Sequence, residues 1–198
     1  WVWWYDNKKL KYSGYYVKGS KDGKWIEYNS DGKLLVDGVY DMKTKWNGIF
    51  RGEYYFDGIK AEEHNDYFAD GGSTAKISAK GLMINDSIKI GKWDFFRKDG
   101  SKKNSGDFDK NKKTGEWEYW YKSGDNEKVG FFKNDIMDGK WEGWYYSGQK
   151  FYVRTYKLGK KEGLWAWWNS DGSKKYEGMY LNDKKDGKWS QWNEKGDI

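Results

Sequence analysis

Large aromatic residues alternate with polar residues along this chain and return, together with glycines, at a fixed interval. The tripeptide Gly-x-Trp begins at Gly91, Gly115, Gly139, Gly163 and Gly187, and Gly23-Lys24-Trp25 belongs to the same series. A fixed period of this length is typical of proteins built from stacked repeats. Each phrase is therefore first a building unit of the fold, and any function has to be sought in surfaces that many units build together.

Several positions of the 24-residue unit are constrained, counting from the glycine of Gly-x-Trp. Position 1 is Gly, position 3 is Trp, position 10 is Gly, position 16 is usually Gly, and position 18 is Tyr or Phe. Lys8 replaces the glycine at position 10, and Arg154 replaces the glycine at position 16. Position 6 is aromatic and is occupied by Trp4, Tyr28, Phe96, Trp120, Trp144, Trp168 and Trp192.

The unit predicts a β-hairpin. Aromatic-rich runs favour strands, and the Asp-Gly or Ser-Gly pairs between them supply the positive φ that a tight turn needs. A lone hairpin is marginal in water, so consecutive hairpins must stack edge to edge. We therefore predict an all-β fold, an elongated single antiparallel sheet of stacked β-hairpin repeats about 75–80 Å long at ~4.8 Å per strand.

The chain is predicted to be one β-hairpin repeat array over residues 1–198, with regular repeats at 1–47 and 91–198 and degenerate repeats at 48–90. Gly23 and Gly91 are closer in sequence, by four positions, than three perfect repeats would place them. The degenerate segment reads as a kink, a bulged hairpin or a contact site, and sequence drift is the preferred interpretation. Since the first and last repeats are partial, we expect a longer array or ends capped by another segment.

The composition makes this core aromatic instead of aliphatic. The chain has 15 Trp, 17 Tyr and 9 Phe, and each large ring buries roughly 150–250 Å² when it packs. Without cysteine, disulfides, thiolate catalysis and cysteine-based zinc sites are excluded. The net charge of +6 comes from 37 basic and 31 acidic residues that are interleaved, which indicates a solvated surface and disfavours nucleic acid as a partner.

Two motifs are candidate sites of chemistry. His64 is the single histidine, and Glu62, Glu63, Asp66 and Asp70 lie near it in sequence, but no nucleophile is placed beside it by spacing. Asp107-x-Asp109-x-Asn111 has the spacing that opens a calcium loop but lacks the glycine and the distal glutamate. We therefore predict no catalytic residue, no metal site and no cofactor, and we expect that the protein is not an enzyme.

Two features are predicted to bind a partner. The first is the aromatic row at position 6, represented by Trp4, Trp120, Trp144, Trp168 and Trp192, which lies on the opposite face from position 3 unless a bulge brings both to one side. The second is a basic stripe of loop lysines, which stacking lines up along one sheet edge. Solvation of that edge, which resists aggregation, is the preferred interpretation of the stripe. Its members are Lys112, Lys113, Lys160, Lys161, Lys184 and Lys185.

The repeat G-x-W-x-x-W-x-x-x-G-x-x-x-x-x-G-x-Y resembles the bacterial variant of the MORN repeat over nearly the whole chain, most strongly at 1–47 and 91–198. The resemblance implies stacked hairpins that bind proteins or assemble, including antitoxin-like proteins, and it transfers no catalytic motif. We therefore predict a non-catalytic scaffold for protein–protein interaction or assembly, with homo-oligomers allowed. The alternative is a surface-associated binder of carbohydrate or anionic membrane lipid. The compartment stays open between cytoplasm and cell surface, because the chain starts at Trp1 and not at Met.

Overall fold

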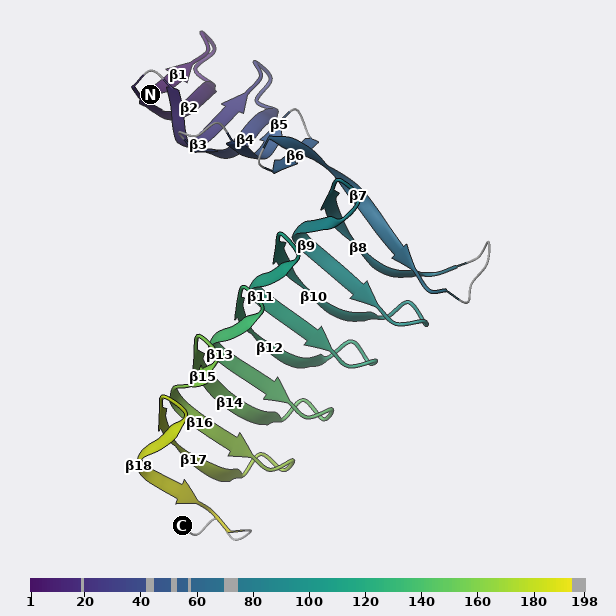
Figure 1. Ribbon diagram of the computed structural model, residues 1–198, viewed down its shortest axis with the longest axis vertical. Coiled ribbons are helices and arrows are strands. Elements are labelled where there is room, and N and C mark those ends of the chain that lie inside the picture. The colour runs from purple at the N-terminus through teal and green to yellow at the C-terminus, as the bar shows by residue number, and fades with distance from the viewer. Residues whose placement is uncertain (19, 42–44, 51–52, 57, 70–74, 194–198) are drawn as a thin grey trace. The chain divides into compact units, whose positions relative to one another are not determined.

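The computed structural model is built of β-strands, and it describes residues 1–18, 20–41, 45–50, 53–56, 58–69 and 75–193. None of these residues lies in a helix. The chain divides into two compact units, the first made of Trp1–Glu63 and Met83–Ile88 and the second of His64–Leu82 and Lys89–Ile198. The prediction of an all-β fold made of consecutive antiparallel hairpins is confirmed (Figure 1).

The strands follow one another in sequence and pair with their sequence neighbours. The sheet of the first unit consists of β1 (Val2–Trp4), β2 (Leu10–Val17), β3 (Ser20–Tyr28), β4 (Leu34–Asp41), β5 (Lys45–Phe50) and β6 (Glu53–Phe56). The strands β7 (Ile59–Tyr67) and β8 (Ile77–Ile84) contribute residues to both units, and so does β9 (Ile88–Phe96) through Ile88. The regular part of the second unit consists of β9 (Ile88–Phe96), β10 (Lys102–Asp109), β11 (Lys112–Trp120), β12 (Asn126–Lys133), β13 (Ile136–Trp144), β14 (Lys150–Lys157), β15 (Lys160–Lys161), β16 (Gly163–Trp168), β17 (Lys174–Leu181) and β18 (Lys184–Gln191).

The degenerate segment contains shortened hairpins. β5 and β6 pair at only three positions, and so do β6 and β7. Parts of this segment, residues 51–52, 57 and 70–74, lie outside the described residues.

Two kinds of connection alternate along the regular part of the second unit, and each kind lines one edge of the sheet (Figure 1). Two-residue turns such as Asn182–Asp183 have positive φ at both residues, 48° and 67°, as a type I′ turn requires. The longer loops place a glycine with positive φ at repeat position 10, as at Gly100 with 89°. In that loop Ser101 donates its hydroxyl and its backbone N–H to Asp99, which lowers the pKa of Asp99 to about 2.

Side chains in these connections join each hairpin to the next. At the two-residue turns, Asp135 Oδ1 accepts from the backbone N–H of Lys113 at 2.8 Å, and the backbone N–H of Asp135 donates to Lys113 O at 2.9 Å. At the other edge, the Tyr121 hydroxyl donates to the backbone oxygen of Trp144 at 2.8 Å. Such bonds satisfy backbone groups at the turns and fix the stacking of successive repeats.

A β-bulge at the start of each Gly-x-Trp strand sets which way the rings point. Gly106 pairs with Trp117, whereas the next residue, Asp107, pairs with Thr114, so Gly115 and Glu116 form the bulge, with φ of 65° at Gly115. From Gly115 onward the strand alternates regularly, which separates positions 3 and 6 onto opposite faces of the sheet. We call these two faces the Trp117 face and the Trp120 face.

The Trp117 face holds the core. Trp93 and Trp117 are 0% exposed, and Trp165 is almost as deeply buried; within the first unit, the equivalent Trp25 is 2% exposed. The position-18 rings on either side pack edge-on to Trp117, with the Phe108 centroid at 5.2 Å and the interplanar angle at 89°. The indole N–H of Trp117 donates to the backbone oxygen of Asp107 at 3.2 Å, so the buried donor is satisfied.

The glycine at position 16 makes room for this tryptophan. A Cβ on Gly106 would lie 2.3 Å from Cδ2 of Trp117, closer than any real contact. The same approach occurs between Gly14 and Trp25 in the first unit, at 2.2 Å. The glycine is therefore required for the close approach of a ring, not for its own backbone conformation.

The exception at Arg154 has its own packing arrangement. The guanidinium stacks on Tyr152 with 4.1 Å between its carbon and the ring centroid, and it also faces Trp165 at 5.5 Å. Gly143 replaces the aromatic residue found in this position of neighbouring repeats, and a Cβ there would lie 2.4 Å from the Tyr152 ring. A ring from the adjoining strand thus fills the space that a side chain at position 143 would occupy.

Candidate binding surface

The predicted aromatic row lies on the Trp120 face of the second unit. Trp120, Trp144, Trp168 and Trp192 are half-buried, in contrast to the buried rings of position 3. Among the described residues, the ring contacts of Trp117 involve Phe95, Phe108, Tyr119 and Phe132 but not Trp120. Trp4, the remaining predicted member, belongs to the first unit and is 60% exposed.

Lysine ammonium groups lie between successive rings of this row. Lys150 pairs with Trp144 across its hairpin and carries Nζ over the ring of Trp168, 5.9 Å from the centroid. Two further lysines stand at the same repeat position. Nζ of Lys102 lies 5.1 Å from the centroid of Trp120, and Nζ of Lys174 lies 5.3 Å from that of Trp192. These distances fall within the range of cation–π attraction.

The same lysines form ion pairs with carboxylates on the Trp120 face. Nζ of Lys102 lies 2.8 Å from Asp94, and Nζ of Lys150 lies 2.7 Å from Glu142. Burial by itself raises the pKa of Asp94 and Glu142, but the hydrogen bonds and charges of their lysine partners outweigh it and lower both pKa values. The surface therefore combines rings, ammonium groups and carboxylates in a repeating pattern.

Exposed apolar side chains extend this surface toward the two-residue turns. Leu164 and Met179 lie opposite each other on β16 and β17 and are 43% and 45% exposed. Phe131 occupies the same repeat position as Met179 and is 43% exposed. The Trp120 face is thus more apolar in its described parts than a purely solvated sheet face would be.

The basic stripe separates into two sets of lysines. Lys112, Lys160 and Lys184 are exposed, as predicted for a solvated edge. Lys113, Lys161 and Lys185 turn onto the Trp117 face, where Nζ of Lys113 lies 4.4 Å from the Trp117 centroid; the values are 5.0 Å for Lys161 over Trp165 and 4.4 Å for Lys185 over Trp189. Burial lowers the pKa of Lys113, with repulsion from Lys128 adding to the effect and attraction to Asp135 opposing it.

The contacts between these lysines and the position-3 tryptophans were not predicted from the sequence, although the spacing of the two residue types indicates them. Lysine precedes the position-3 tryptophan by four residues in five repeats, as Lys21 precedes Trp25. Residues four apart in a strand lie on the same face, and the pairing skips two residues at Gly-x-Trp, which keeps that alternation. The spacing alone therefore predicts the lysine on the same face as the ring.

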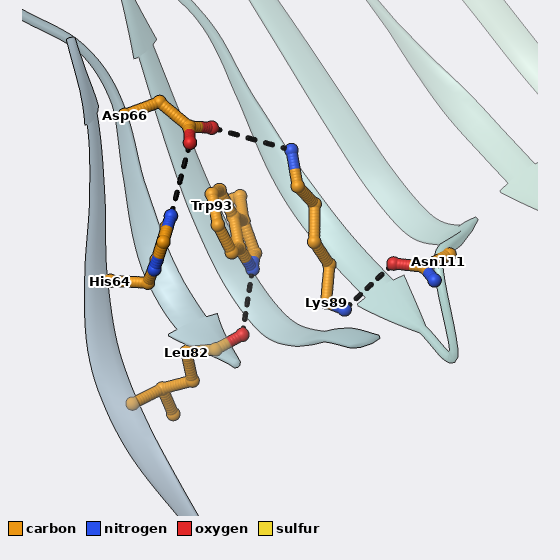
Figure 2. A network of polar contacts seen from close by, with 6 residues as sticks. All are labelled: His64, Asp66, Leu82, Lys89, Trp93 and Asn111. Atoms are coloured by element: carbon orange, nitrogen blue, oxygen red, sulfur yellow. Dashed lines mark hydrogen bonds and ion pairs between the residues drawn. The ribbon is translucent and has the colours of Figure 1, made fainter. Parts of the chain in front are cut away.

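His64 belongs to a network beside the buried Trp93 (Figure 2). Its Nε2 lies 3.0 Å from Asp66 Oδ1, and the other carboxylate oxygen lies 3.7 Å from Nζ of Lys89. Nζ of Lys89 is 4.2 Å from the Trp93 centroid, and the His64 ring centroid is 6.2 Å from that of Trp93. Of the acidic neighbours considered for His64, Asp66 is the one this network contains, and Asp70 lies outside the described residues.

The candidate calcium loop is part of the repeat structure. Phe108 packs against Trp93 and Trp117, and Asn111 Oδ1 accepts from the backbone N–H of Lys89 at 2.7 Å. Within the described residues, no group of three His, Cys, Asp or Glu side chains is placed to hold a metal ion. That part of the chain also has no helix with the length and hydropathy needed to span a membrane.

Comparison with models of known protein families gives no match for this chain. A comparison with curated proteins gives no significant match either.

Proposed function

We propose that this chain is a non-catalytic repeat scaffold that binds a protein partner through the Trp120 face. The observation that carries the proposal is the half-buried tryptophan row at position 6, because the core is already supplied by the buried tryptophans of the opposite face. Tryptophan is one of the residue types most enriched at the energetic centres of protein interfaces. The repeats add such groups at regular intervals along one face.

The non-catalytic part of the proposal rests on the engagement of the groups that could do chemistry. His64 is held by Asp66 beside Trp93 and Lys89, in a region that packs the core. The resemblance to bacterial MORN-variant repeats, including antitoxin-like proteins, favours a specific form of the proposal in which the scaffold covers the active surface of its partner.

The test is a binding experiment with a surface block. The purified chain is used to capture a partner, which is then produced separately so that the affinity of the reconstituted complex can be measured. The double substitution Leu164→Arg and Met179→Arg adds bulk and charge to the Trp120 face at exposed positions and should weaken binding at least about tenfold. Tyr146→Arg, at a loop residue that is 65% exposed, is the matched control and should leave the affinity unchanged. A stoichiometric partner that binds the double variant with unchanged affinity would contradict the proposal.

A second candidate, binding to anionic lipid, is favoured by the exposed Lys112, Lys160 and Lys184, which follow three of the two-residue turns. Each such lysine near a charged membrane contributes about 1 kcal/mol. Sedimentation with phosphatidylserine vesicles, compared with phosphatidylcholine vesicles, tests it. Binding to the anionic vesicles that is lost when the three lysines are changed to glutamate would favour this candidate over the first.

A further inference from the structure

The row of rings and ammonium groups on the Trp120 face is interrupted at one place. Repeat position 12 is lysine at 102, 150 and 174, but in the repeat between them it is Asn126. Asn126 pairs with Trp120 across its hairpin, as Lys150 pairs with Trp144. Among the described residues, no cationic group lies over the ring of Trp144, although Trp120, Trp168 and Trp192 each have one.

The neighbouring repeats show which chemical group belongs at such a place. Each position-12 lysine covers the position-6 ring of the following repeat, as Lys102 covers Trp120, and Asn126 stands at the same separation before Trp144. The asparagine side chain is too short to carry a group to that ring, and it has no charge. We call the place bounded by Glu118, Trp120, Asn126 and Trp144 the Asn126 interval.

Glu118 provides a second and independent indication. In the repeats on either side, the position-4 carboxylates of Asp94 and Glu142 each bind the position-12 lysine of their own hairpin. Glu118 is the equivalent carboxylate, half-buried on the same face, and within the described residues it forms no ion pair and no side-chain hydrogen bond. Its cross-strand neighbours are Ser105 and Val129, neither of which is charged.

We propose that the Asn126 interval receives a lysine side chain from the protein partner, with the ammonium between Trp120 and Trp144 and paired with Glu118. This inference rests on the proposed function, since it names the chemistry that the partner presents to the Trp120 face. The guest lysine takes the place that Lys102, Lys150 and Lys174 take in their own repeats. The lowered pKa of Asp94 and of Glu142 agrees with favourable pairing in those repeats.

The Asn126 interval also fixes the position along the repeats at which the partner binds. In the regular part of the second unit, every other interval between described position-6 rings carries an internal lysine, which repels a second cation. A partner with one exposed lysine would therefore dock at a single place along a surface that otherwise repeats with every hairpin. Specificity of position arises from one asparagine in an otherwise repeating pattern.

The inference can be tested without the partner. The probe is Nα-acetyl-lysine methylamide, titrated into the whole chain while the indole N–H signals of the tryptophans are followed by NMR. The signals of Trp120 and Trp144 should shift with a roughly millimolar dissociation constant, as expected for a single side chain. The norleucine analogue, which has the same aliphatic stem without the ammonium, is the matched control and should not shift them.

Two reciprocal substitutions sharpen the test. Asn126→Lys fills the interval from within and should abolish the response of Trp144, and Glu118→Gln should weaken the binding at least about threefold. Lys150→Asn opens the equivalent interval beside Glu142 and should add a response at Trp168. Unchanged signals elsewhere confirm that each variant is folded.

Several outcomes would overturn the inference. One is a lysine probe that shifts Trp120 and Trp144 no more than norleucine does; another is binding that survives Asn126→Lys. Preference for tetramethylammonium with no response to the lysine probe would assign the interval to a small ammonium compound instead of a protein side chain. The proposed function fails in a different way. In that case the affinity of the partner is unaffected by substitutions on the Trp120 face, while the probe still binds at Trp144.

Discussion

The two faces of the sheet in the second unit carry the same residue types and use them differently. Trp117 lies over Gly106, a cross-strand neighbour with no side chain, and is 0% exposed. Trp120, three residues later, lies opposite Asn126 on the other face and is half-buried. The two tryptophans thus differ in the residue across the strand, which is glycine for Trp117 and asparagine for Trp120.

The lysines beside these rings show the same contrast. Lys113 lies over Trp117 without a side-chain ion pair among the described residues, and burial lowers its pKa. Lys102 lies over Trp120 and pairs with Asp94 at 2.8 Å. One face thus uses the aliphatic stem of lysine as packing material, whereas the other keeps a balanced set of charges in contact with solvent.

Removing one ring from each face tests the difference between the two faces most directly. Trp117→Ala should lower the free energy of unfolding by about 3–5 kcal/mol, because a large buried ring is lost and its space is not refilled. Trp120→Ala removes a half-buried ring and should cost only about 1–1.5 kcal/mol. Urea denaturation followed by circular dichroism measures both. Equal losses would mean that the two faces contribute alike to the core.

The role of the facing glycine is tested by Gly106→Ala. A methyl group there would lie 2.3 Å from Trp117, and overpacking of this kind costs about 1–3 kcal/mol. Adding Trp117→Phe to Gly106→Ala should recover part of the loss, because the smaller ring leaves room for the methyl group. A double-mutant cycle in urea denaturation gives the coupling, and strict additivity of the two losses would exclude the proposed contact.

A third test uses alkaline pH on the Trp117 face. Burial, followed by the charge of Glu127 and the proximity of Tyr152, raises the pKa of Tyr119 to about 12 from its usual value of 10.0. Between these values the unfolded chain releases the phenol proton while the folded chain keeps it, so this contribution to stability is complete below pH 10 and is lost toward pH 12. The loss should be on the order of 1–2 kcal/mol, reduced by solvent screening of a partly exposed group. In Tyr119→Phe, the fall in unfolding free energy over this range should be shallower by that amount, and an unchanged slope would contradict the burial of the phenol.

The fold followed from the sequence because the 24-residue period and the turn glycines are local signals. Gly-x-Trp, Asp-Gly and the aromatic runs each favour hairpins, and stacking is the one way for such hairpins to bury their rings. The separation of Trp117 from Trp120 was left open at that level, since a bulge near the strand start could have placed both on one face. The structure places the bulge at Gly115, before both residues, which leaves the alternation between them intact.

The candidate site was less accessible from the sequence. Trp120, Trp144, Trp168 and Trp192 could be predicted as a row, because they recur at one position of the repeat. The lysine between two rings could not, since Lys150 reaches Trp168 across a register shift and through the stacking of two hairpins. Long-range register decides such contacts, and a single sequence does not specify it.

The smallest expected effect distinguishes the two uses of lysine. On the Trp117 face, the lowered pKa of Lys113 indicates that burial of the ammonium outweighs the attractions it gains, so we expect the stem to carry the stabilising contact. Lys113→Ala should lower the free energy of unfolding by about 1 kcal/mol, because the packing of the stem on Trp117 is lost. Lys113→Met keeps a stem of similar length and should stay within about 0.5 kcal/mol of the original chain. The chain offers a precedent, since Met137 stands at the same repeat position before Trp141.

Lys112→Ala, at the exposed neighbouring position, is the control for Lys113→Ala and should change stability by less than about 0.5 kcal/mol.

The direction in which stability changes with pH provides a further test of Lys113. Because the pKa of Lys113 is lower in the folded chain than its usual 10.5, raising the pH toward 10.5 neutralises the folded form first and should increase stability. Lys113→Met lacks this increase. If Lys113→Met instead lost as much stability as Lys113→Ala at neutral pH, attraction between the ammonium and the Trp117 ring would be the dominant contact, and the two faces would use lysine in the same way.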